Sequence, residues 1–121
     1  MVKTVAKKGV TSDWLAWELD GNHRPSRENV TVAPEQTLVD GQVISFNGSN
    51  QAVAYTGSGS VAGVFVGEAT TGASQTLAGV IVARHARIVF EKLSGTGANE
   101  AAQATTLAGL KTIGITPVRQ A

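Results

Sequence analysis

A chain of 121 residues is long enough for one compact domain and too short for two. It holds no cysteine, which excludes disulfide bonds, thiol catalysis and cysteine-ligated zinc. Its 10 Lys+Arg nearly balance its 9 Asp+Glu, so it lacks the basic excess of nucleic-acid binders, and no nucleic-acid partner is expected. The low charged fraction of 16% indicates that part of the surface is normally covered by another molecule.

The N-terminal residues carry lysines but no continuous apolar run behind them, so they do not predict a secretory signal. The longest apolar stretches, 61–67 and 77–83, are far too short to span a bilayer, and no membrane partner is expected. Together with the lack of cysteine, these features are consistent with folding in a reducing cytoplasm.

Residues 1–33 form a polar first zone that carries both tryptophans of the chain, Trp14 and Trp17. With Leu19 they offer several hundred Å² of apolar surface, since each tryptophan alone presents about 150–250 Å². We predict that this zone is an extended N-terminal arm in front of a domain that spans residues 34–121. Two interpretations stay open: the segment folds back as a lid on its own core, or it anchors the protein to another chain, as tryptophans often do.

The zone from residue 34 to residue 93 reads as strands separated by turns rich in glycine, serine and asparagine. The predicted strands lie at 43–46, 52–56, 61–69 and 77–93. The last of these alternates apolar and polar side chains at period two. Arg84 interrupts its apolar face, so a bend or a strand end is expected near Arg84 and His85.

The C-terminal zone predicts one short helix over residues 100–108. Asn99 is suited to cap its start, and Gly109 is placed to end it. The apolar run at 113–118 predicts a final strand, which Pro117 assigns to an edge or terminal position. The chain as a whole is therefore predicted to be mainly β, with one short C-terminal helix.

No pattern predicts an enzyme, a cofactor or a metal site. A hydrolase would use His85 as a general base oriented by Glu91, but no nucleophile stands at a recognisable spacing. His23 and His85 are too few and too far apart in sequence for a metal site. The glycine-rich loop at 95–100 lacks the lysine and the Ser/Thr of a P-loop, so it is better explained as a loop that leads into a capped helix.

Five segments, taken in order, resemble the head decoration proteins of the lambda-like tailed bacteriophages. They are 26–32 (SRENVTV), 38–43 (LVDGQV), 62–64 (AGV), 79–89 (GVIVARHARIV) and, after the helix, 107–115 (LAGLKTIGI). No single segment is specific, because each consists of glycines and small apolar residues. The resemblance depends on their order and spans nearly the whole chain from Ser26 onward.

The resemblance implies a β-clip-like domain that assembles as a homotrimer. Such trimers sit on the outer surface of the expanded capsid, at three-fold and quasi-three-fold positions, and cement it against the pressure of packaged DNA. It further implies that the partner is the major capsid protein of a tailed phage, that the protein is located in the virion after synthesis in the host cytoplasm, and that the N-terminal arm binds the shell.

Carried onto this sequence, the expected capsid-binding residues are Trp14, Trp17, Leu19, Arg27, Val30 and Val32. Of these, Val30 and Val32 are expected to add as part of a strand to a neighbouring sheet edge. Arg84, His85 and Arg87 are expected at the trimer interface. The alternatives are a trimeric domain associated with a tail or fibre, and a small β-fold hydrolase.

Overall fold

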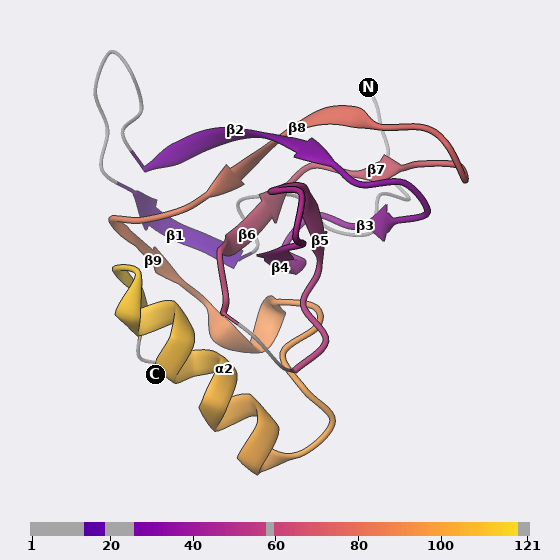
Figure 1. The fold of residues 1–121 in the computed structure, drawn as a ribbon. Coiled ribbons are helices and arrows are strands. Elements are labelled where there is room, and N and C mark those ends of the chain that lie inside the picture. The colour runs from indigo at the N-terminus through magenta and orange to yellow at the C-terminus, as the bar shows by residue number, and fades with distance from the viewer. Residues whose placement is uncertain (1–13, 19–25, 58–59, 119–121) are drawn as a thin grey trace, which may run out of the picture.

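The computed structural model describes residues 14–18, 26–57 and 60–118. Its elements in chain order (Figure 1) are β1 (Leu15–Glu18), β2 (Arg27–Val32), β3 (Thr37–Leu38), β4 (Val43–Phe46), β5 (Ala52–Ala54), β6 (Gly63–Val66), β7 (Ala69–Thr70), β8 (Leu77–Val82), β9 (Ala86–Ile88), the 3-10 helix η1 (Phe90–Lys92), α2 (Glu100–Thr112) and β10 (Ile115–Pro117). The predicted mainly-β class with a helix near the C-terminus is confirmed. No helix in the described part of the chain is long and apolar enough to cross a membrane.

A small closed barrel forms the centre of the molecule, with the strand order β2, β5, β4, β6, β8. Its longest ladder joins β2 to β8 in antiparallel register, from the pair Arg27–Val82 to the pair Val32–Leu77. Apolar side chains fill the interior, and the fully buried ones include Val32, Ile44, Phe65 and Ile81. Gly79 is required on β8 because a Cβ there would lie 2.7 Å from Cε1 of Phe65.

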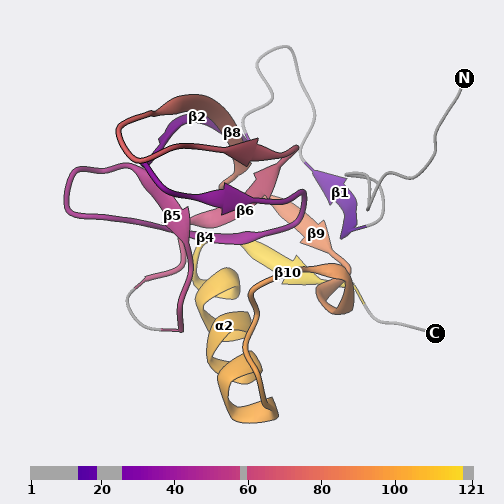
Figure 2. The ribbon, with the colours of Figure 1, turned by 90° about the vertical axis from the view of Figure 1, so that its right-hand side faces the viewer.

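A second sheet of three strands, in the order β1, β9, β10, lies beside the barrel, with α2 next to β10 (Figure 2). β9 is central; it pairs antiparallel with β1 and parallel with β10. A second hydrophobic core fills the space between these parts, and its buried members are Trp14, Val43, Tyr55, Val61, Val64, Val82, Ala86, Ile88, Leu93, Leu110 and Ile115. Trp14 near the start of the described chain and Ile115 near its end therefore pack in the same core.

The predicted bend near Arg84 and His85 is confirmed. His85 has a φ of 56°, in the left-handed region that residues other than glycine seldom adopt. The turn ends β8 at Val82 and starts β9 at Ala86. One long period-two segment of the sequence is thereby divided between the barrel and the second sheet.

The helix begins as predicted but ends later than predicted. Asn99 caps it, since its side-chain oxygen accepts a hydrogen bond of 2.9 Å from the backbone N–H of Ala102. The expectation that Gly109 ends the helix is wrong, because α2 continues to Thr112 and Gly114, with φ 89°, follows its end. Gly109 instead allows close packing, as a Cβ there would lie 2.9 Å from Cγ2 of Val61.

Trp14, which was expected among the capsid-binding residues, is buried in the protein's own core. Its side chain is 1% exposed and is the largest fully buried side chain among the described residues. The described part of the predicted arm is also built into the fold, because β1 belongs to the second sheet and β2 is a strand of the barrel. The predicted boundary between residues 33 and 34 therefore coincides with the end of a barrel strand rather than with the end of an extended arm.

Candidate interaction surfaces

Trp17 is the most exposed large apolar side chain among the described residues, with 52% of its surface accessible. It faces outward because of a β-bulge in β1. Leu15 pairs with Ile88, whereas Trp17, two residues later, pairs with Arg87, only one residue away from Ile88. The extra residue turns Trp17 to the face opposite Leu15, although a regular strand would place both on the same face.

A row of three exposed side chains crosses the outer face of the second sheet. In register they are Trp17 on β1, Arg87 on β9 and Thr116 on β10. We call this row the Trp17–Arg87 row. Tryptophan and arginine are the residue types most enriched among the energetically dominant residues of protein interfaces. The structure thus brings together two residues that the sequence analysis had assigned to different interfaces.

Trp14 lies in the second core against the backbone of Gly41. A Cβ at Gly41 would lie 2.9 Å from Cδ1 of the indole, and its φ of 90° also requires glycine. The backbone oxygen of Trp14 accepts a hydrogen bond of 2.7 Å from the N–H of Val89. The indole Nε1 is buried and has no hydrogen-bond partner among the described residues. Trp14 therefore holds the start of β1 on the core, as the lid interpretation proposed.

Arg27 is held in an ion pair that ties β1 to β2. Its Nη2 lies 2.7 Å from Oε2 of Glu18 and its Nε lies 3.0 Å from Oε1, so the guanidinium grips the carboxylate with two nitrogens. The hydroxyl of Ser26, which is fully buried, donates to the same carboxylate. The last residue of β1 is thereby bonded to the start of β2. The predicted contact residue Arg27 thus has an intramolecular role in this structure.

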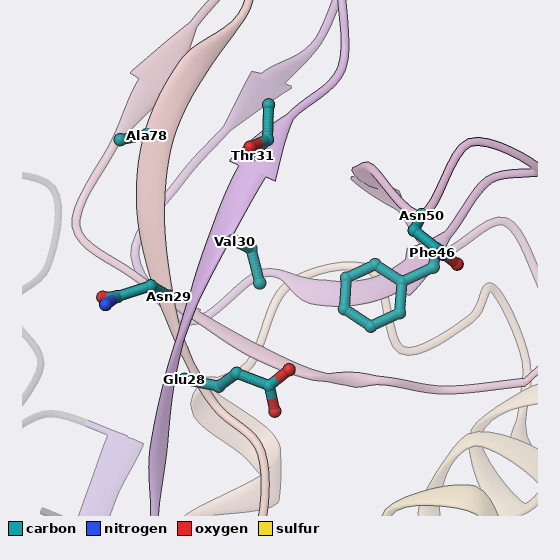
Figure 3. Close-up of a pocket in the computed structure, with 7 residues that line it drawn as sticks. All are labelled: Glu28, Asn29, Val30, Thr31, Phe46, Asn50 and Ala78. Carbon is teal, nitrogen blue, oxygen red and sulfur yellow. The ribbon is translucent and has the colours of Figure 1, made fainter.

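Val30 and Val32, the two predicted strand-adding residues, have different environments. Val32 is fully buried inside the barrel. Val30 is partly buried and lines an open groove beside β2, where its side chain and that of Phe46 point toward one another (Figure 3). Phe46 is 40% exposed, although its position at a predicted strand end gave no sign that it would face solvent. Of Val30 and Val32, only Val30 is accessible to a partner.

The three residues expected at a trimer interface lie around the bend. Nη2 of Arg84 binds Oε1 of Glu28 on β2, and both side chains are roughly half exposed (40% and 45%). His85 is exposed in the bend, and Arg87 belongs to the Trp17–Arg87 row. His85 and Arg87 are thus exposed, whereas Arg84 is partly exposed and ion-paired, and their assignment to a trimer interface stays a prediction.

Three residues that the sequence analysis considered fall within positions 19–25. Leu19, His23 and Arg24 lie outside the described residues. Among the residues that are described, no group of three or more His, Cys, Asp and Glu side chains is placed to hold a metal ion.

The glycine-rich loop before α2 is bonded to its own helix. Oγ1 of Thr106 donates to the backbone oxygen of Thr96, and Nε2 of Gln103 donates to that of Gly97. With Asn99 bonded to Ala102, these contacts agree with the plain interpretation of a loop that feeds a capped helix.

The fold and these surfaces define a small β-rich protein with an exposed tryptophan and an exposed arginine side by side on one sheet. The family model for Bacteriophage lambda head decoration protein D matches residues 4–115. The chain therefore belongs to the family of lambda head decoration protein D, as the resemblance of its ordered segments had predicted. No individual curated protein matches it.

Proposed function

We propose that this protein is the cement of a tailed-phage capsid: a homotrimer that binds the outer surface of the expanded shell at its three-fold and quasi-three-fold positions. Membership of the head decoration family supports a structural role in the phage capsid. The observation that carries the proposal on this chain is Trp17, an exposed tryptophan on an ordered strand. We also propose that the domain has a β-clip-like fold.

Covering Trp17 would supply a useful part of the binding free energy. About half of its surface is accessible, and a tryptophan offers about 150–250 Å² in all, so a partner would remove roughly 100 Å² of it from water. At about 25 cal/mol per Å², this burial is worth about 2–3 kcal/mol for each copy before the costs of association.

The strand that carries Trp17 is ordered before binding. β1 pairs with β9, Trp14 packs in the core at its start, and Glu18 is bonded to Arg27 at its end. Ordering a free segment on the shell would cost about 1–2 kcal/mol per residue. Because β1 is already ordered in the free protein, Trp17 would bind the shell without this cost.

A trimer would present three copies of Trp17 to the shell, so that three modest contacts act together. Three copies joined in one rigid body can raise avidity by roughly 10² to 10⁴ over a single contact. Each trimer would then oppose the separation of the capsid subunits that it bridges, which is the physical basis of cementing against internal DNA pressure.

The other predicted residues enter the proposal in two ways. Leu19 and Val30 are proposed as direct contacts with the major capsid protein. Trp14, Arg27 and Val32 are proposed to act indirectly, since the first and the last are buried and Arg27 is bonded to Glu18.

For the trimer interface we propose Arg84, His85 and Arg87. Arg87 lies next to Trp17 in register, so we place it where the contact between subunits meets the surface that faces the shell.

The substitution Trp17→Ala tests the proposal. We expect the purified variant to keep its unfolding temperature and to lose at least tenfold of its affinity for expanded shells in a co-sedimentation assay. Leu77→Ala, which shortens another exposed apolar side chain (36% accessible) on a different sheet, is the matched control and should bind as the natural protein does. Undiminished binding of Trp17→Ala would contradict the proposal, and a labelled antibody on intact particles would distinguish the shell from a tail or fibre.

A further inference from the structure

Arg87 lies at the centre of the outer face of the second sheet. Its neighbours on β9, Ala86 and Ile88, are buried in the second core, so the side chain of Arg87 points away from that core. In register, Trp17 lies on one side of it and Thr116 on the other. Directly opposite residues of an antiparallel pair have Cβ atoms about 4.5–5.5 Å apart. A partner that covers the indole of Trp17 therefore also covers Arg87.

The guanidinium of Arg87 has no acidic partner among the described residues. Within them, its side chain forms no ion pair and no hydrogen bond. Glu18 is the only acidic residue of β1, β9 and β10, and its carboxylate is held by Arg27 and Ser26. The outer face of this sheet thus carries a positive charge that no side chain in the described part of the chain neutralises.

Covering Trp17 changes what this charge requires. On the free protein, water solvates the guanidinium, and an ion pair that stayed exposed would contribute little to binding. A partner that removes water from the indole also removes part of the hydration of Arg87, because the two side chains lie next to each other. A covered charge without a counter-ion strongly opposes association. A partner that buries Trp17 therefore has to supply acceptor groups for Arg87.

A carboxylate is the acceptor that fits best. A guanidinium donates two parallel hydrogen bonds to the two oxygens of a carboxylate, and the opposite charges strengthen both. Backbone carbonyl groups would accept the same hydrogen bonds but leave the charge uncompensated. The apolar surface of Trp17 keeps water away from the pair, which makes it stronger than an exposed ion pair. The Trp17–Arg87 row thus matches a partner segment in which an acidic residue has apolar neighbours.

We propose that the Trp17–Arg87 row recognises an acidic side chain of the major capsid protein, an aspartate or a glutamate flanked by apolar residues. The apolar residues lie on the indole of Trp17, the carboxylate binds the guanidinium of Arg87, and the hydroxyl of Thr116 is a further donor at the end of the row. This inference rests on the proposed function, which gives the shell as the partner, and adds the chemistry by which the shell is recognised.

Three substitutions at Arg87 test the inference in the co-sedimentation assay with expanded shells. Arg87→Gln removes the charge and should weaken binding at least about tenfold. Arg87→Glu brings two carboxylates together and should weaken binding by at least about tenfold more. Arg87→Lys keeps the charge but loses the paired nitrogens, so its affinity should lie between those of the natural protein and Arg87→Gln. Binding of all three variants at the natural affinity would overturn the proposal.

Lys111→Glu is the matched control, because it makes the same change in charge at another exposed position. Lys111 belongs to α2, which packs on the core side of the sheet through Leu110, whereas Arg87 faces the opposite side. We expect this variant to bind within about threefold of the natural protein, since salt screens distant charges. If Lys111→Glu loses as much affinity as Arg87→Glu, the effect belongs to the net charge and the assignment to Arg87 is overturned. The unfolding temperatures of all these variants should match that of the natural protein, because both side chains are exposed.

A compensating change in the shell identifies the carboxylate. Among expanded shells in which single exposed acidic residues of the capsid protein are replaced by lysine, one should bind the natural protein poorly and Arg87→Glu well. If no such shell restores the binding of Arg87→Glu, Arg87 does not pair with a carboxylate and the proposal is overturned.

Trp17→Ala separates this inference from the proposed function. If Trp17→Ala loses its binding while the Arg87 variants bind as the natural protein does, the proposed function stands and this inference fails. If neither Trp17→Ala nor Arg87→Glu changes the binding, both fail. Loss of binding in both, with recovery of Arg87→Glu on one lysine-substituted shell, is the result that we expect.

Discussion

Trp14 and Trp17 stand three residues apart and have opposite environments. Trp14 is buried against Gly41, whose lack of a side chain makes room for the indole, and Trp17 is turned to solvent by the bulge that follows Leu15. Burying Trp14 has a cost, because its indole N–H has no partner among the described residues and an unpaired buried N–H disfavours the folded state by about 1–3 kcal/mol. Its aromatic surface outweighs that cost, so Trp14 stabilises the domain while Trp17 remains available to a partner.

Substitutions at the two tryptophans should therefore differ in their effect on stability. We expect Trp14→Ala to lower the free energy of unfolding by about 3–5 kcal/mol, because it leaves a large cavity in the second core. Trp14→Phe should cost clearly less, since it keeps most of the ring and removes the unpartnered N–H. Denaturant titration measures both, with Trp17→Phe as the exposed control, which should change stability by less than about 0.5 kcal/mol. Equal losses for Trp14→Ala and Trp14→Phe would contradict this account.

At the scale of elements, β1 is attached to the fold at both of its ends. Trp14 and its bond from Val89 fix the start, and Glu18 fixes the end through Ser26 and Arg27. β9 lies between β1 and β10, so removing β1 would expose one edge of β9 as well as the second core. β1 is for these reasons an integral strand of the domain.

Two truncations separate the integral part of the N-terminal region from the rest. A chain that starts at residue 13 keeps Trp14 and β1, and we expect its free energy of unfolding to change by less than about 1 kcal/mol. A chain that starts at Ser26 loses Trp14 and β1, and we expect a loss of at least about 3 kcal/mol, as for other large deletions from a core. Thermal unfolding followed by circular dichroism compares them, and equal melting temperatures for the two truncated chains would show that β1 is dispensable.

For the whole molecule, the proposed cementing role predicts a preference between two forms of the shell. If the surface that covers Trp17 exists only after capsid expansion, the trimer should decorate expanded shells and leave unexpanded shells bare. Sedimentation of the free protein checks its trimeric size, and mixing it with both kinds of shell checks the preference. Equal decoration of the two would show that expansion does not create the binding surface.

The sequence predicted those features of the fold that depend on local chemistry. Asn99 predicted the start of α2, because its side chain satisfies a backbone N–H within three residues. Arg84 predicted the bend that separates β8 from β9, because a charged residue interrupts an otherwise apolar face. In contrast, the end of the helix was misplaced at Gly109, because the partner of that glycine is Val61, which is distant in sequence.

The candidate site was only partly predictable for the same reason. Trp17 was identified as an exposed residue, but its neighbour Arg87 is brought beside it by strand pairing across some 70 positions of the chain. The exposure of Phe46 was not foreseen, since the position of a residue at a strand end does not reveal whether another part of the chain will cover it.

The sequence by itself determined the mainly-β class, the bend, the cap of the helix and, through the order of its segments, the family of head decoration proteins. Only the tertiary structure decided which tryptophan is buried in the core and which lies on the surface. Burial depends on contacts such as that between Trp14 and Gly41, which folding makes between positions far apart in the chain, whereas caps and turns depend on neighbours that the sequence already places together.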